Sequence, residues 1–154
     1  MPYEARTSQI ASRPIAAVRA HVKLSELSTA IPVYLGEVWD LLRKNDFKSF
    51  GRNVVIYYPL GHSDGDMTFD AQFGVEIDAT LPASSRVMTS VTPGGTVAVT
   101  THTGDYSKLG EAHRAIHAWC ARNGHTMRGP NWEVYGHWTG DQSKAQTDVY
   151  YLLK

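Results

Sequence analysis

The chain has 154 residues, about the size of one domain, and its apolar share of 42% is too high for a disordered chain. Fifteen basic residues balance fifteen acidic ones, so the basic excess that is typical of nucleic-acid-binding proteins is missing. No apolar run is long enough to cross a membrane, and residues 1–13 lack the apolar core of a signal peptide. A single cysteine, Cys120, excludes an intrachain disulfide. These features predict a soluble, cytoplasmic protein with one domain over residues 1–154.

Two segments have apolar residues at helical spacing, and the rest alternates between strand and turn patterns. The expected elements, in chain order, are strands at 3–9 and 14–23, a helix at 30–45, strands at 53–59, 67–78, 86–91 and 96–103, a helix at 106–123, and strands at 132–138 and 147–153. Pro32 suits the first turn of the first helix, where its missing N–H costs nothing. Asn123-Gly124 is a strong signal for the end of the second helix. Turns are expected at Gly61–Gly65 and Pro93–Gly95, and a loop at Pro82–Ser85.

The order strand–helix–strand–strand occurs twice, over pseudo-repeats at about 3–80 and 86–154. Within them, Ala17–His21 parallels Ala98–His102, and each of these runs precedes a helix that carries a tryptophan. The repeated order predicts an α+β domain, an antiparallel sheet with two helices on one face. Two helices on one sheet leave a central groove between them, which is where small molecules usually bind.

Strand alternation predicts which side chains face the helices. Phe73 and Tyr151 belong to apolar sets on that side, and aligning Tyr57 with Tyr135 adds both of these tyrosines and Glu133. A carboxylate among aromatic rings is costly unless it is hydrogen-bonded, protonated or bound to a ligand. The alternative is that Glu133 faces solvent, since its neighbours on the opposite side of the strand are also apolar.

Other candidate residues have structural interpretations. His113 and His117 have the i, i+4 spacing of metal ligands, but no third ligand is evident, so we expect a role at the edge of the helix stripe and no metal. Cys120 is expected in the core. Trp39 and Trp119 are expected primarily in the core and secondarily in the groove lining. No phosphate-binding loop or serine elbow is present, and no cofactor is expected.

Four motifs resemble the GyrI-like small-molecule-binding family, which also provides the effector-binding domain of many multidrug-responsive transcription regulators. They are Thr103-Gly104-Asp105-Tyr106-Ser107-Lys108-Leu109, Gly129-Pro130-Asn131-Trp132-Glu133-Val134-Tyr135, Thr147-Asp148-Val149-Tyr150-Tyr151-Leu152, and Phe69-Asp70-Ala71-Gln72-Phe73-Gly74-Val75-Glu76. The resemblance implies a duplicated fold with a central ligand groove. It also implies that Glu133 matches a glutamate that contacts cationic or aromatic ligands. No helix-turn-helix fits before Pro14, so the chain resembles a stand-alone member without direct contact to nucleic acid.

Three functions stay open at this point. The first is a binding protein for small aromatic molecules, cationic ones included, with Glu133 as the counter-charge. The second, implied by a resemblance to stand-alone members that open cyclopropane-containing genotoxins, is a hydrolase with Glu133 and Tyr57 as catalytic residues. The third is an interaction domain that inhibits a protein partner. The expected ligand-binding residues are Glu133, Tyr57, Tyr135, Tyr151, Trp39, Trp119 and Phe73.

Overall fold

A computed structural model of the protein describes residues 3–46, 50–79, 81, 86–136 and 140–154. The predicted loop at 82–85 and residues 137–138 of the last-but-one predicted strand lie outside the described residues. The chain divides into two compact units: Ser12–Thr92, here called the α1 unit, and Met1–Ala11 with Pro93–Lys154, here called the α2 unit. Each unit is a four-stranded antiparallel sheet with one long helix packed on one face, and the protein has an α+β fold as predicted.

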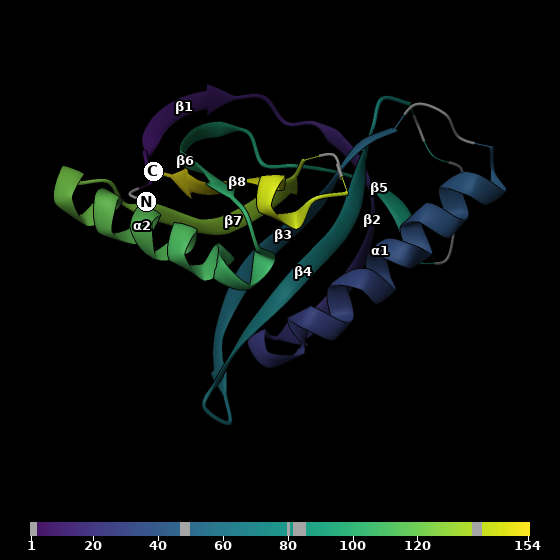
Figure 1. The fold of residues 1–154 in the computed structure, drawn as a ribbon. Helices are drawn as coiled ribbons and strands as arrows, with labels where there is room; N and C mark the ends of the chain where they lie inside the picture. The colour runs from purple at the N-terminus through teal and green to yellow at the C-terminus, as the bar shows by residue number, and fades with distance from the viewer. Residues whose placement is uncertain (1–2, 47–49, 80, 82–85, 137–139) are drawn as a thin grey trace. The chain divides into compact units, whose positions relative to one another are not determined.

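The α1 unit has its strands in the order β5-β2-β4-β3. Its elements are β2 (Pro14–Lys23), the 3₁₀ turn η1 (Leu24–Glu26), α1 (Leu27–Lys44), β3 (Phe50–Ser63), β4 (Asp66–Ile77) and β5 (Val87–Val91). Helix α1 packs against β2 and β4 (Figure 1). The turn between β3 and β4 is made by Asp64 and Gly65, both with positive φ, as a two-residue hairpin turn requires.

The α2 unit has the matching order β1-β6-β8-β7. Its elements are β1 (Arg6–Ile10), β6 (Gly95–Thr103), the 3₁₀ turn η2 (Tyr106–Lys108), α2 (Leu109–Asn123), β7 (Met127–Tyr135), the 3₁₀ turn η3 (Gln142–Lys144) and β8 (Gln146–Leu153). Helix α2 packs against β6 and β8. The predicted repeats put the first strand with the first helix and the strand at 86–91 with the second. Each of these edge strands instead pairs within the other unit.

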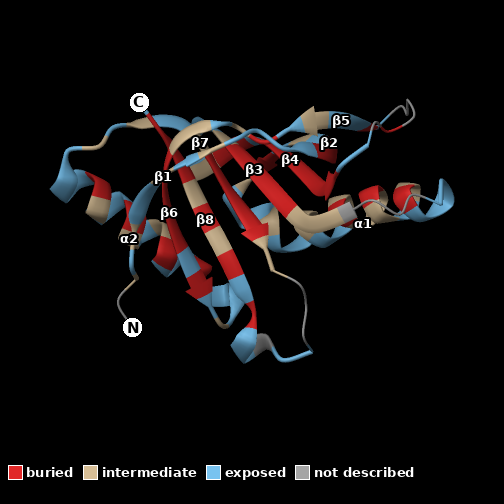
Figure 2. Ribbon diagram, turned by 90° about the horizontal axis from the view of Figure 1, so that it is seen from above, coloured by how far each residue is buried: buried red, intermediate tan, exposed pale blue. Residues whose placement is uncertain are grey.

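Both helices cover an apolar face of their sheet, and the central strands are buried over continuous stretches, such as residues 71–77 of β4 (Figure 2). The cluster under α1 contains Ala16, Val18, Val38, Leu42, Val75, Ile77, Leu81 and Val87. The cluster under α2 contains Ala98, Leu109, Ala112, Ile116, Cys120, Val149, Tyr151 and Leu153. Neither helix combines the length and the hydrophobicity that a membrane span needs, over the ranges of the chain that the structure describes.

The predicted internal alignment of Ala17–His21 with Ala98–His102 is wrong by one residue. When β4 and β8 are aligned at Asp70 and Asp148, Val18 opposite Phe73 becomes the counterpart of Ala98 opposite Tyr151, and each lies in the cluster under its helix. A slip of one residue exchanges the two faces of a strand. His21 is accordingly exposed beside Asp70, and His102 is buried on the helix-covered side.

Helix α1 begins earlier than predicted, at Leu27 instead of residue 30. Pro32 therefore lies inside the helix and not in its first turn, where the missing N–H would have been free of cost. The prediction for α2 is closer to the structure. Asp105 accepts a hydrogen bond from the Ser107 N–H at the start of η2, and Gly124 ends α2 with a φ of 72°.

Candidate functional site

A bulge in β7 precedes Glu133, and the strand pairs regularly with β8 from Asn131 to Tyr135. The pairing of β7 with β8 shifts register between Met127 and Asn131. Gly129, with a φ of 125°, lies in this interval, and so does Pro130, which has no N–H to give to a strand ladder. Beyond the bulge Glu133 pairs with Val149, which belongs to the cluster under α2. Glu133 therefore points to the helix-covered face and not to solvent, the direction that aligning Tyr57 with Tyr135 predicted.

The Glu133 carboxylate is buried, with 5% of the residue exposed, and it accepts short hydrogen bonds from Tyr135 and His113. The Tyr135 hydroxyl donates to Oε1 at 2.5 Å. His113 Nε2, which comes from α2, lies 2.7 Å from Oε2. A carboxylate without its proton only accepts hydrogen bonds, so Nε2 is the donor of this pair. Helix α2 and strand β7 thus both hold the carboxylate in place.

The second nitrogen of His113 continues the chain of hydrogen bonds. His113 Nδ1 lies 2.7 Å from the Tyr151 hydroxyl on β8. With an uncharged imidazole, Nδ1 accepts from this hydroxyl while Nε2 donates to the carboxylate. Burial, and then the negative charge of Glu133, raise the pKa of Tyr151, so this phenol keeps its proton. We call Glu133, Tyr135, His113 and Tyr151 the Glu133 network.

Aromatic and hydroxyl groups surround the Glu133 network. The Tyr106 ring meets Tyr135 edge to face, with ring centres 5.7 Å apart. His117, one turn after His113, meets the Tyr151 ring in the same way at 5.0 Å. Burial, and then the charge of His113, lower the pKa of His117. Thr147 pairs with Tyr135 across the strands, and its buried hydroxyl has no hydrogen-bond partner within the part of the chain that the structure describes.

Three of the predicted site residues belong to the α1 unit. Tyr57 pairs with Ala71 and therefore stands where Glu133 stands in the α2 unit, instead of matching Tyr135 as aligned from the sequence. Phe73 is fully buried and its ring packs against Tyr34. The third residue is Trp39. That these three residues share one site with Glu133 remains a prediction.

The two helix tryptophans are half-buried and only partly in the core. Trp39 packs against the cluster under α1 and donates from Nε1 to the Asn53 side chain at 2.8 Å. Trp119 packs against the cluster under α2 and stacks on His125, with ring centres 5.0 Å apart. Their role in the groove lining remains a prediction.

The sequence interpretation missed His113. His113 is half-buried, as expected for the edge of the apolar stripe, but it also bridges Glu133 and Tyr151, which was not predicted. Two features of the sequence could have predicted this contact. A buried Glu133 carboxylate needs hydrogen-bond donors, and His113 is a possible donor at the edge of the apolar stripe of the helix. No group of three or more His, Cys, Asp and Glu side chains within the described ranges is arranged to hold a metal ion.

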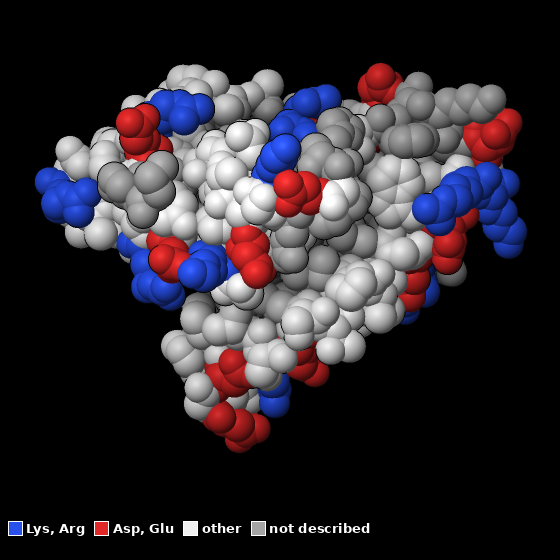
Figure 3. Space-filling model, in the orientation of Figure 1, with Lys and Arg blue, Asp and Glu red and all other residues white. Residues whose placement is uncertain are grey.

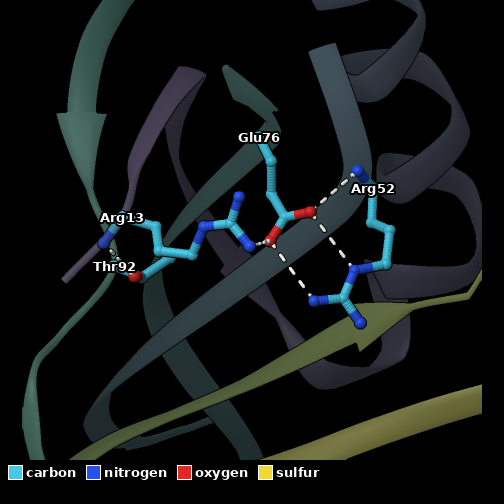
Figure 4. A network of polar contacts seen from close by, with 4 residues as sticks. All are labelled: Arg13, Arg52, Glu76 and Thr92. Atoms are coloured by element: carbon cyan, nitrogen blue, oxygen red, sulfur yellow. Dashed lines mark hydrogen bonds and ion pairs between the residues drawn. The ribbon is translucent and has the colours of Figure 1, made fainter. Parts of the chain in front are cut away.

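A second buried carboxylate, Glu76, lies in the α1 unit and has a different environment (Figure 4). Arg52 donates to it from the backbone N–H at 2.9 Å and from Nε at 3.2 Å, and Arg13 Nη1 lies 3.3 Å away. Burial acts to raise the pKa of Glu76, but these donors and positive charges outweigh it and lower the pKa. Gly51 makes this packing possible, because a Cβ there would lie 2.8 Å from Glu76 Oε1. This carboxylate is held as a structural ion pair.

A surface hollow also lies in the α1 unit, with a volume of about 640 Å³. It is lined by Arg19, Ala20, His21, Tyr58, Asp70, Ala71 and Gln72, and it contains none of the predicted site residues. On the face that Figure 3 shows, acidic and basic side chains are interspersed. Such mixing agrees with the balanced net charge of the sequence.

Residues 4–154 match the family model of the GyrI-like small molecule binding domain. The chain therefore belongs to the GyrI-like family, and the resemblance seen in its motifs is confirmed. The family binds small molecules, and the Gly-Pro-x-x-Glu-Val-Tyr motif of this chain is the segment that places Glu133. A search of curated proteins found no match.

Solved structures share this fold at low sequence identity. The C-terminal domain of EcmrR has a TM-score of 0.80 and 17% identity, and the match covers 100% of this chain and 99% of that chain. SAV2435 bound to tetraphenylphosphonium has a TM-score of 0.66 and 16% identity, with 98% and 94% covered. A hydrolase from Listeria innocua has a TM-score of 0.62 and 10% identity, with 99% and 93% covered.

Proposed function

We propose that this protein binds aromatic small molecules that carry a positive charge, with Glu133 as the counter-charge. The observation that carries the proposal is the buried Glu133 carboxylate, held by the Tyr135 hydroxyl and His113. A cation gains from a fixed negative charge and from aromatic faces, and both effects are larger away from water. The chemistry of the Glu133 network fits a ligand of the kind named in the SAV2435 structure, tetraphenylphosphonium.

The test compares a cation and a neutral molecule of similar shape. Methyltriphenylphosphonium and triphenylphosphine oxide share three phenyl rings and differ in charge. Calorimetric titration of the wild type and Glu133→Gln should show that the cation loses about 1–3 kcal/mol of binding free energy in the variant. The neutral ligand should change by less than about 0.5 kcal/mol, because Gln keeps the shape of the side chain.

Glu76→Gln is the matched control, since Glu76 is also a buried glutamate but has arginine partners. It should bind both ligands as the wild type does. If Glu133→Gln leaves cation binding unchanged, or weakens both ligands equally, Glu133 is not a counter-charge.

A second candidate function is hydrolysis of a cyclopropane-bearing electrophile. It is favoured by the His113–Glu133 pair, which resembles a base held in orientation by a second group. Glu133 would take a proton from water while the water oxygen bonds to a ring carbon. The strained C–C bond would break, its electron pair would pass to the acceptor group of the substrate, and the resulting anion would take up the proton that Glu133 removed from water. Mass spectrometry of such a substrate after incubation should show addition of one water, with turnover at least about 10²-fold lower in Glu133→Gln.

A further inference from the structure

Glu133 has a partner that can itself become positively charged. His113 Nε2 lies 2.7 Å from the carboxylate, and the two side chains are only 20% and 7% exposed. Histidine is the residue whose charge changes between about pH 5 and pH 8. The carboxylate is therefore flanked by a group that is either a neutral donor or a competing cation.

We propose that His113 decides which ligands the Glu133 site accepts. An uncharged His113 leaves the network with one negative charge for a ligand cation, and a protonated His113 neutralises that charge from within the protein. This inference rests on the proposed binding of aromatic cations at Glu133, and it adds the residue that sets the charge preference.

Distance favours the internal cation over an aromatic ligand. Coulomb energy falls with separation, and the imidazole nitrogen is already at 2.7 Å from the carboxylate oxygen. The phosphorus centre of a triphenylphosphonium is enclosed by carbon, so its charge stays farther from the oxygen. A protonated His113 thus removes most of the attraction that a ligand cation would otherwise find.

The other titratable groups of the α2 unit around His113 do not duplicate this role. Tyr135 donates to Glu133 from β7, and the raised pKa keeps the Tyr151 phenol on β8 protonated. On α2 itself, the lowered pKa of His117 means that it takes up a proton less readily than an ordinary histidine. His117 also meets the ring of Tyr151, while His113 contacts the carboxylate directly.

The experiment measures the affinity of methyltriphenylphosphonium and triphenylphosphine oxide at pH 8 and pH 5.5. Neither ligand changes charge in this range, so a change in affinity reports on the protein. For the wild type we expect cation binding to weaken by about tenfold at pH 5.5, and neutral binding to stay within about twofold. In His113→Gln, which keeps an N–H donor but cannot become charged, cation binding should be nearly independent of pH.

His117→Gln is the matched control, because it removes a neighbouring histidine of the same helix and should keep the tenfold effect. His113→Asn is a second uncharged variant if His113→Gln does not fold by circular dichroism. A wild type without pH dependence, or a His113→Gln that keeps it, overturns the inference while cation binding at pH 8 still supports the proposed function. Absence of cation binding by the wild type at both pH values overturns the proposed function and this inference with it.

Discussion

The α1 and α2 units have the same strand order, and each has one helix packed on one face of its sheet. The side chains on this helix-covered face differ between the two units. In the strand registers, Tyr57, Phe69, Phe73 and Val22 of the α1 unit correspond to Glu133, Thr147, Tyr151 and His102 of the α2 unit. The α1 unit places apolar or aromatic side chains at all four positions. The α2 unit places groups that need hydrogen bonds, and burial of such groups is costly unless they are paired.

The two buried glutamates extend the comparison. Glu76 is matched by two arginines, which fix its charge and lower its pKa. Glu133 accepts hydrogen bonds from a tyrosine and a histidine, which are uncharged donors when the imidazole is neutral. The same side chain thus serves as a structural ion pair in one unit and as the proposed ligand counter-charge in the other. Four substitutions test this division, from the largest expected effect to the smallest.

Phe73→Ala should lower the free energy of unfolding by about 3–5 kcal/mol, because it leaves a cavity at a fully buried position. Urea denaturation followed by circular dichroism measures the change. A loss below about 1 kcal/mol would show that Phe73 lines an open space and not a packed core.

Glu76→Gln should lower the free energy of unfolding by about 1–3 kcal/mol at pH 7, through loss of charge-assisted hydrogen bonds. The pKa of Glu76 is lowered in the folded state, so its contribution is fully present above the ordinary value of 4.5 and is lost as the pH falls through the lowered pKa. The variant should therefore lose less stability than the wild type between pH 7 and pH 3. Denaturation at both pH values decides this, and parallel pH profiles would contradict the ion-pair role.

Tyr151→Phe makes this position of the α2 unit like Phe73 of the α1 unit. It removes the hydroxyl next to His113 Nδ1 and should cost about 0.5–1.5 kcal/mol of unfolding free energy. Thermal or urea denaturation gives the value. An unchanged stability would indicate that the chain of hydrogen bonds through His113 does not hold in solution.

Thr147→Val keeps the shape of a fully buried side chain and removes a hydroxyl that has no hydrogen-bond partner among the described residues. The variant should be more stable by up to about 1 kcal/mol, since a buried unpaired hydroxyl is costly. If the variant is instead destabilised by a similar amount, the hydroxyl has a partner in solution, such as an ordered water.

Local patterns predicted much of the fold and the direction of Glu133. Most predicted strands lie within a few residues of the observed ones, and Asn123-Gly124 ends α2 as expected. Aligning Tyr57 with Tyr135 placed Glu133 on the helix-covered face. The alignment is two residues off, but a shift of two residues keeps the same face of a strand, so the predicted direction is correct.

The features that sequence patterns did not predict depend on long-range pairing. The edge strand β1 pairs with β6 in the α2 unit, and β5 pairs with β2 in the α1 unit, the reverse of the predicted repeats. Pairing between strands far apart in the sequence has no local sequence pattern that predicts it. The one-residue slip between Val18 and Ala98 arose because short similar runs do not fix register. His113 was missed for the same reason, since its partners Glu133 and Tyr151 are 20 and 38 residues away in the sequence.

A crystal structure of the wild type with methyltriphenylphosphonium tests the central claim most directly. We expect the phosphonium against the Glu133 carboxylate, with a phenyl ring in contact with at least one tyrosine of the Glu133 network. Glu76 should keep its two arginine partners in that structure. A ligand bound elsewhere, for example in the hollow beside Tyr58 and Asp70, with the Glu133 network unchanged, would contradict the claim that Glu133 provides the ligand counter-charge.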